Sequence, residues 1–253
     1  MKLELDVALG APILFHLGPL PISSTMIWQV LIAAGLMWFF VKLVRNWQDI
    51  PSRLQAAVEL LVETGIHTLT DIIGHKGRAQ QIFPFAMTIF VYVMICNLLP
   101  VILPVNAFSV PASGGVMTAL FRSPMADYNQ TLIFALISVT IMQFSFIMIN
   151  GLRAYVGKFF NFSEPIDFFL GLMDIVGEVA KILSLSFRLF GNIFAGEVLT
   201  MIILLLLPFA LPLPFMFLGI FTAVIQAFVF ALLSAVFIGQ ALTPLEAEPK
   251  SAS

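Results

Sequence analysis

Charged residues are scarce in this chain of 253 residues, of which 10% are Asp, Glu, Lys or Arg and 60% are hydrophobic. Soluble domains carry about 25% charged residues, whereas the mean hydropathy here is +1.04. This composition excludes an ordinary soluble domain and predicts a protein that crosses a membrane several times. The formal net charge of −2 does not bear on nucleic-acid binding, but the chain lacks a basic cluster, so no nucleic-acid partner is expected.

Cysteine is almost absent as well. The single residue, Cys96, lies in an apolar run, which excludes a disulfide framework and a thiolate metal site and predicts a small buried hydrophobe. No residue pattern suggests a metal or an organic cofactor, and none is expected. The first ten residues lack the basic start and short apolar core of a secretory signal. We therefore expect no cleaved signal, and the first membrane helix directs insertion.

Long apolar runs predict five membrane helices. Their expected ranges are 25–44, 82–103, 131–150, 166–207 and 215–240. The stretch 51–78 instead places apolar residues at helical spacing with acidic residues between them, which is typical of an amphipathic helix on the inner membrane surface. A cytoplasmic helix docked on a partner protein is the alternative. The expected fold class is all-α: a polytopic membrane protein whose single membrane domain covers residues 1–253.

The basic residues predict how the chain is oriented. With the N-terminus outside and the C-terminus inside, eight Lys and Arg side chains lie on the inner side and two on the outer side, in agreement with the positive-inside rule. The inner set is Lys42, Arg45, Arg53, Lys76, Arg78, Arg153, Lys158 and Lys250, and the outer set is Lys2 and Arg122. Lys181 and Arg188 remain within the membrane.

The fourth apolar run is too long for a simple span. Its 42 residues would form a helix of about 63 Å, whereas the hydrocarbon core is about 30 Å thick. The helix must therefore be broken or strongly tilted, which suggests a surface that lies along another body. Pro212 and Pro214 mark a tight break after it, so the fifth helix should return antiparallel.

Arg188, inside that fourth run, is the most informative residue. An arginine stays protonated, and within hydrocarbon it costs roughly 2.5 to 17 kcal/mol unless a partner or water receives it. Arg188 is therefore a candidate functional residue. The alternative is a buried structural ion pair with Asp174 or Glu178.

Other polar residues form a stripe with Arg188. On a helical wheel, four lie within about 40° of it: Asp174, Lys181, Ser184 and Asn192. Glu197 lies about 180° away and Glu178 about 80° away. A fixed positive charge on one face and a carboxylate on the other suit a proton path with a barrier, because carboxylates relay protons and the arginine repels them. A leak would dissipate about 2.3 kcal/mol per proton at 100 mV.

Each of these residues also has a purely structural explanation. Asn192 and Ser184 are residue types that often pack between membrane helices. Lys181 can extend its ammonium group to the membrane interface, and Glu197 can be a carboxylate at the outer interface. Gln226 lies 14 residues after the break at Pro212 and Glu197 lies 15 before it, so their depths match. A plain packing glutamine remains the alternative for Gln226.

The segment Ser184–Glu197, SLSFRLFGNIFAGE, together with Ile225–Phe230, IQAFVF, resembles subunit a of the F-type ATP synthase membrane sector. Three shorter stretches are similar to signatures of the same family: IFPF at 82–85, CNLLP at 96–100 and ADYN at 126–129. The resemblance extends from the first helix to Gln240.

This resemblance implies a proton-translocating stator subunit of a rotary ATP synthase, with no catalytic site of its own. Arg188 matches the essential arginine that faces a carboxylate on a rotating ring, stabilises its ionised form and separates two half-channels. Asn192, Glu197 and Gln226 match the outer half-channel. Asp174 and Glu178 match the inner exit, and Lys181 and Ser184 lie between that exit and Arg188. The outer entry is matched by Asn97, Asp127 and Asn129.

The resemblance also implies partners and a location. The expected partners are a ring of small hairpin subunits with an essential carboxylate, peripheral-stalk b-type subunits, the soluble ATPase sector reached through the stalk, and membrane lipid. The expected location is the bacterial inner (plasma) membrane, in preference to the mitochondrial inner membrane. The coupling ion, proton or sodium, depends on ligands of the ring.

Two positions depart from the family pattern, and two other classes of protein compete with it. Gly219 and Pro100 stand where some members carry ionisable residues. A self-contained secondary transporter usually shows inverted repeats, which this chain lacks, and a passive membrane anchor leaves Arg188 and Glu197 unexplained. Only the rotary hypothesis requires a companion ring that carries a carboxylate.

Overall fold

The computed structural model describes residues 13–17, 20–102, 109–111, 117–119, 123–159, 165–206 and 212–243. The helices in these ranges are α1 (Ser24–Arg45), α2 (Arg53–Ile73), α3 (Lys76–Ile102), α4 (Tyr128–Phe159), α5 (Pro165–Leu206) and α6 (Pro212–Ala241). Two short antiparallel hairpins pair β1 (Ile13–Leu17) with β2 (Leu20–Ser23) and β3 (Ser109–Pro111) with β4 (Met117–Ala119). A 3-10 helix, η2 (Pro124–Ala126), precedes α4. The all-α prediction is confirmed, although the hairpins were not foreseen.

Four helices within the described ranges are long and apolar enough to cross a membrane. They are α1, residues Lys76–Leu99 of α3, α4, and residues Leu213–Ala241 of α6. The remaining predicted span, 166–207, is present as α5, a single helix of 42 residues, but it is not among the four. Charged residues recur along it, so its apolar character is interrupted.

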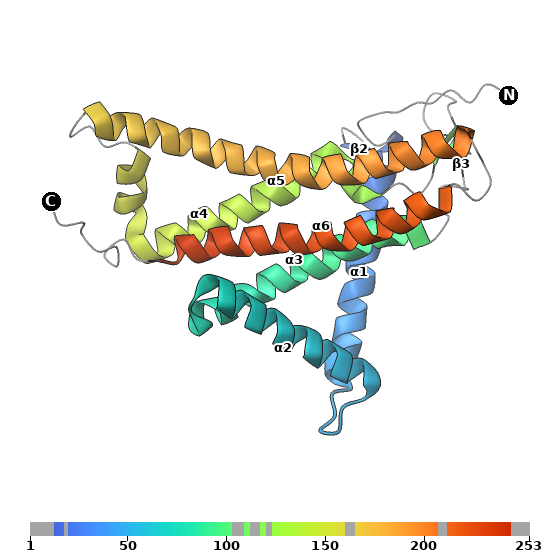
Figure 1. The fold of residues 1–253 in the computed structure, drawn as a ribbon, viewed down its shortest axis with the longest axis horizontal. Helices are drawn as coiled ribbons and strands as arrows, with labels where there is room; N and C mark the ends of the chain where they lie inside the picture. Colours follow the sequence, from blue (N-terminus) through green and yellow to red (C-terminus); the bar gives the residue numbers. More distant parts are fainter. Residues whose placement is uncertain are drawn as a thin grey trace.

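The helices do not share one direction (Figure 1). α5 and α6 lie alongside each other, α3 packs mainly on α6 and α4 mainly on α5, whereas α1 runs steeply across all of them. Helices that cross so steeply cannot all stand along the membrane normal. If α1 spans the membrane directly, α5 and α6 are strongly inclined, which supports the tilt that the length of α5 predicts.

The predicted amphipathic helix 51–78 is divided by a tight turn. α2 begins after Ser52, whose hydroxyl accepts a hydrogen bond from the backbone N–H of Gln55 at 3.3 Å. It ends at Gly74, which adopts the left-handed conformation (φ 75°) that stops many helices. α3 then begins at Lys76, so the second membrane helix starts earlier than residue 82. An apolar period does not reveal a break of two residues, which explains the error.

The predicted third helix, 131–150, continues past its expected end. α4 has a kink at Gly151 (φ 82°, ψ 157°), and a second helical segment extends from there to Phe159. This segment turns back toward the start of α5 (Figure 1). A Cβ added at Gly171 of α5 would collide with the carbonyl of Phe159, so glycine at 171 permits the close approach of the two helices. That approach holds Lys158 beside α5.

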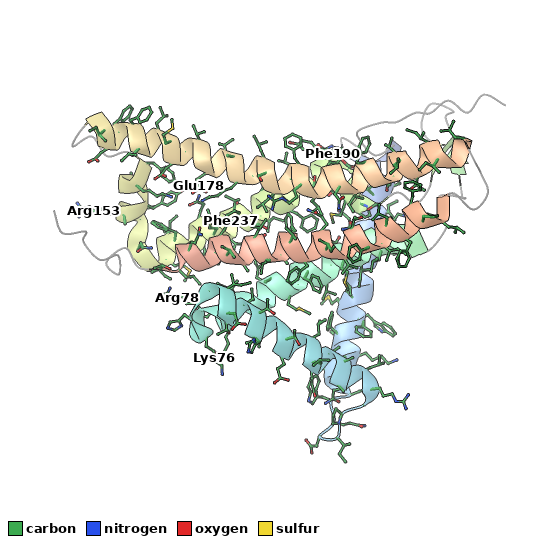
Figure 2. All side chains as sticks on the ribbon, in the orientation of Figure 1. Lys76, Arg78, Arg153, Glu178, Phe190 and Phe237 are labelled. Carbon is green, nitrogen blue, oxygen red and sulfur yellow. The ribbon has the colours of Figure 1, made fainter. Side chains whose placement is uncertain are left out.

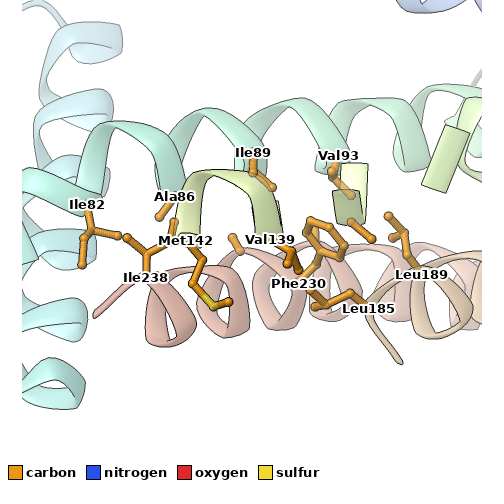
Figure 3. Close-up of a cluster of buried hydrophobic side chains, with 14 of the residues drawn as sticks. Ile82, Ala86, Ile89, Val93, Val139, Met142, Leu185, Leu189, Phe230 and Ile238 are labelled. Carbon is orange, nitrogen blue, oxygen red and sulfur yellow. The ribbon is translucent and has the colours of Figure 1, made fainter. Parts of the chain in front are cut away.

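The core lies where α3, α4, α5 and α6 meet (Figure 3). The core contains Leu185 and Leu189 of α5, Phe230 and Ile238 of α6, Val139 and Met142 of α4, and Ile82, Ala86, Ile89 and Val93 of α3. Because Leu185 and Leu189 are almost completely buried, they set the rotation of α5 about its own axis. Cys96 is also completely buried, as predicted.

Candidate functional site

Arg188 lies on the outward face of α5. Its neighbours Leu185 and Leu189 point into the core, whereas Arg188 and Phe187 are exposed. Within the described ranges, no hydrogen bond or ion pair joins Arg188 to another residue. The alternative of a structural ion pair is therefore wrong: Asp174 is about 21 Å away along the helix and Glu178 about 15 Å, at 1.5 Å per residue.

The predicted polar stripe follows this outward face only in part. Ser184 is exposed like Arg188, and Asp174 and Asn192 are half-buried. Lys181 turns away to a different partner, because its Nζ lies 3.1 Å from Oε1 of Glu178. The fixed charge of Arg188 and the carboxylate of Glu178 thus belong to separate surroundings.

Glu197 lies on the other side of α5, as the helical wheel predicts. The backbone N–H of Ser123 donates to its Oε1 at 3.3 Å. Ser123 directly precedes η2, whose three residues are buried and which packs against α5. Glu197 is half-buried and faces the protein, so the alternative of a purely interfacial carboxylate does not describe it.

Asp127 is the second carboxylate in this region, and it is 3% exposed. The hydroxyl of Thr25 donates to its Oδ2 at 3.4 Å, and the backbone N–H of Asn129 donates to its Oδ1 at 3.1 Å. Because η2 connects Ser123 to Asp127, the two carboxylates stand at opposite ends of one short buried element. The resemblance implies an outer-entry position for Asp127, and the structure places it at the opposite end of η2 from Ser123, whose N–H contacts Glu197.

Several buried polar atoms near these carboxylates lack partners. In the described part of the chain, neither side-chain polar atom of Asn97 has a hydrogen-bond partner, and the same holds for the amide nitrogens of Gln226 and Gln29. A buried polar atom without a partner costs about 1–3 kcal/mol. Such groups are commonly satisfied by buried water. These buried groups are therefore candidate positions for buried water.

Small hydroxyl residues in this region were not predicted as site residues. Besides Thr25 and Ser123, the hydroxyls of Thr131 and Ser186 lie 3.4 Å apart and are completely buried. Serine and threonine are so common in membrane helices that neither type marks a site in the sequence. Only the packing of α1 on η2, of η2 on α5 and of α4 on α5 reveals them.

Glu178 forms the centre of a second cluster, nearer the start of α5 (Figure 2). Its Oε1 lies 3.4 Å from Nζ of Lys158 and 3.1 Å from Nζ of Lys181. Asp174, one helical turn earlier, is half-buried. Lys158 was predicted only as an inner basic residue, because the turn at Gly151 that brings it here leaves no clear mark in the apolar pattern.

The fold and the site together define the class of the protein. It is a multi-pass membrane subunit in which one long charged helix presents an arginine outward and a carboxylate to a buried polar cluster. Such intramembrane charges mark ion pathways.

Comparison with known proteins identifies the family. The family model described as ATP synthase A chain matches residues 25–239, so the chain belongs to the ATP synthase subunit a family. It is therefore a proton-translocating membrane subunit of ATP synthase without a catalytic site of its own.

The curated relatives agree over nearly the whole chain. ATP synthase subunit a of Moorella thermoacetica is 34% identical over 225 residues, which are 89% of this chain and 93% of the relative. The chloroplastic subunit a of Oedogonium cardiacum is 31% identical over 94% of this chain and 90% of its own. ATP synthase subunit a 2 of Pelobacter propionicus is 30% identical, with 92% and 93% covered.

Proposed function

We propose that the outward face of α5 around Arg188 packs against a rotating ring of small hairpin subunits, and that Arg188 is both the barrier between two half-channels and the coupling charge. The observation that carries this proposal is the exposure of Arg188 without a partner in the described chain. An uncompensated guanidinium in a membrane costs several kcal/mol. A carboxylate of the ring would compensate it, and the guanidinium would in turn favour the ionised carboxylate.

The surroundings of Arg188 support a protein partner of this kind. Exposed apolar side chains cover the same side of α5, among them Phe187, Leu199 and Ile202. α6 adds Phe221, Ile225 and Phe228, which are also exposed. Large contiguous apolar surfaces favour binding of protein or lipid, and a helix of a partner protein can place a carboxylate at the depth of Arg188.

The outer half-channel in this proposal passes through the buried polar cluster. Protons enter near Asp127 and Asn97, reach Glu197, and continue by way of Gln226 and Asn192 to the ring. The hydrogen bond between Ser123 and Glu197 and the unpartnered amides of Asn97 and Gln226 support this path. Water at those amides would carry the proton between side chains that do not touch.

The inner half-channel runs from the ring to the start of α5. We assign Asp174 and Glu178 to its exit, with Ser184 and Lys181 between the exit and Arg188. The whole chain then acts as one membrane domain, with its N-terminus outside and its C-terminus inside a bacterial inner membrane. Peripheral-stalk subunits would hold it against the ring, and the stalk would link it to the soluble sector.

The experiment that tests this proposal is Arg188→Ala in the assembled complex, reconstituted in liposomes. We expect ATP-driven acidification to be abolished while assembly is intact and passive proton flux is retained or increased. Arg45→Ala is the matched control, because Arg45 is an exposed arginine at the end of α1 and should leave pumping unchanged.

Normal pumping by the Arg188→Ala complex would sink the proposal. Loss of assembly would show instead that Arg188 has a structural role. A ring that carries an essential carboxylate must also copurify with the chain, because a self-contained transporter needs none.

A further inference from the structure

Two lysines share one carboxylate oxygen beside a pocket between α4, α5 and α6. Lys158 and Lys181 both contact Oε1 of Glu178, at 3.4 and 3.1 Å. Their side chains are 32% and 30% exposed, whereas that of Glu178 is 13% exposed. The other oxygen, Oε2, is buried and has no hydrogen-bond partner among the described residues. Of the three side chains in contact, two are positive and one is negative. Asp174, one helical turn before Glu178, does not line the pocket and forms no ion pair with either lysine among the described residues, so one positive charge in the pocket is not paired.

The pocket beside this cluster has room for a small polar group. Its volume is about 130 Å³. Its polar lining consists of Gln143, Lys158, Glu178, Lys181 and Gln240, and aromatic side chains such as Phe237 line the rest. The cavity thus has both a polar and an apolar part, which suits an amphiphilic ligand better than an ion alone.

The unused hydrogen-bonding groups define the chemistry of that ligand. Each ammonium has three N–H donors, and Glu178 accepts from each lysine only once. The lysines also lie over aromatic rings, at 5.2 Å for Lys158 over Phe159 and 5.5 Å for Lys181 over Phe237, but a ring stabilises a cation without neutralising it. The pocket therefore lacks one negative charge, and Oε2 of Glu178 lacks one donor.

We propose that this pocket binds a hydroxyl-bearing phosphate group, namely the headgroup of an anionic glycerophospholipid such as phosphatidylglycerol. Its phosphate would contact Lys158 and Lys181, and its hydroxyl would donate to Oε2 of Glu178. Basic pockets between membrane helices on the cytoplasmic side bind anionic headgroups in this way. A zwitterionic headgroup would leave the positive charge unbalanced. Free phosphate has the same chemistry and is the other source of such a ligand.

The backbone around Lys158 supports a built site. Gly151 turns the end of α4 back, and Gly171 lets the carbonyl of Phe159 approach α5 more closely than any side chain would permit. Lys158 is thereby held against Glu178 from a separate element. The proposal does not depend on Arg188, because lipid binding is measured without rotation or proton flux.

The test uses the assembled complex with Lys158→Gln, and Arg153→Gln as the matched control. Arg153 lies on the same segment of α4, is exposed, and does not line the pocket. The complexes are incubated with phosphatidylglycerol in detergent and washed, and the retained lipid per complex is measured by mass spectrometry over a range of concentrations. We expect about five-fold weaker retention for Lys158→Gln, from about 1 kcal/mol per lysine, and no change for Arg153→Gln.

Two further arms complete the test. Glu178→Gln keeps the shape of the side chain but removes the negative charge and replaces one acceptor oxygen with an NH2 group. Because the two lysines then lose their anionic partner, anion retention should rise or stay equal. A competition arm with inorganic phosphate distinguishes the sources, because displacement of the lipid at millimolar phosphate would identify a soluble anion as the ligand. The proposal would be overturned by equal losses of lipid in Lys158→Gln and Arg153→Gln, or by no loss in either variant. It would also be overturned by a loss in Glu178→Gln as large as that in Lys158→Gln.

Discussion

At the scale of single residues, the rotation of α5 about its axis decides which polar groups can act together. Leu185 and Leu189 are buried against α3, α4 and α6, so Arg188 faces outward and Glu197 faces η2. The two charges are therefore separated by the helix itself. In the proposed proton path, this separation keeps the carboxylate of Glu197 apart from the positive charge of Arg188.

Glu197→Gln tests the relay role of the carboxylate. Glutamine preserves the size of the side chain and can still accept from the N–H of Ser123, but it cannot carry a proton. We expect ATP-driven acidification by the reconstituted complex to fall about ten-fold or more, equivalent to at least about 1.4 kcal/mol in barrier height. Glu63→Gln, at an exposed position of α2, is the control, and equal activities of both variants would contradict the role of Glu197.

Asn97→Leu separates stability from proton transfer. Asn97 is 2% exposed and its side chain has no hydrogen-bond partner in the described ranges. Replacing a buried polar group that lacks a protein partner with an apolar group of similar shape is nearly neutral or stabilising. We expect unchanged or higher thermal stability of the complex but several-fold slower proton flux in liposomes. Lower stability with normal flux would show that Asn97 has only a packing role.

At the scale of elements, two glycines decide how the end of α4 meets α5. Gly151 adopts a positive φ where α4 turns back, and Gly171 permits contact with the carbonyl of Phe159. Without this approach Lys158 would not reach Glu178. An apolar pattern registers the lengths of α4 and α5 but not this contact, since the contact depends on a missing Cβ.

Gly171→Ala should therefore destabilise the complex. The added methyl group would force α4 and α5 apart, at a cost of about 1–3 kcal/mol typical of overpacking. Gly177→Ala is the matched control on the same helix, because nothing lies within 4 Å of its added Cβ and alanine favours the helix by up to about 1 kcal/mol. Thermal inactivation of the purified complex measures both. Equal stability of the two variants would contradict the close approach.

At the scale of the whole molecule, α1 runs at a steep angle to α5 and α6 (Figure 1), so α5 and α6 are inclined if α1 spans the membrane directly. A helix of 42 residues that stood upright would extend beyond both sides of the hydrocarbon core. Inclined, it can lie along the side of a curved partner over many residues. The exposed apolar side chains of α5 and α6 cover that face.

Cross-linking tests which face meets the ring. In a Cys96→Ala background, which removes the only cysteine of the chain, Phe187→Cys should cross-link to a cysteine placed near the carboxylate of a ring subunit. Leu185→Cys, two residues earlier but buried, should not. Gel electrophoresis under non-reducing conditions measures both products. Cross-linking from Leu185→Cys alone would mean that α5 is rotated differently in the complex.

Much of the fold could be predicted because apolar runs and helical periodicity act over whole segments. The helical character of 166–207 and the opposite placement of Arg188 and Glu197 both follow from helical periodicity, and the structure confirms them. The break at Gly74 and the extension of α4 to Phe159 were missed. Both depend on one glycine each, whose backbone conformation has no signature in hydropathy.

The sequence by itself determined the class of fold, the family, and the residues whose charge is costly in a membrane, because burial of charge is a property of residue type. Only the tertiary structure decided which of these residues meet. Glu178 pairs with Lys158 rather than with Arg188, and Asp127 and Glu197 flank η2 together with Thr25 and Ser123. Such pairings join residues far apart in the chain, and they arise from how six helices pack, which no local pattern records.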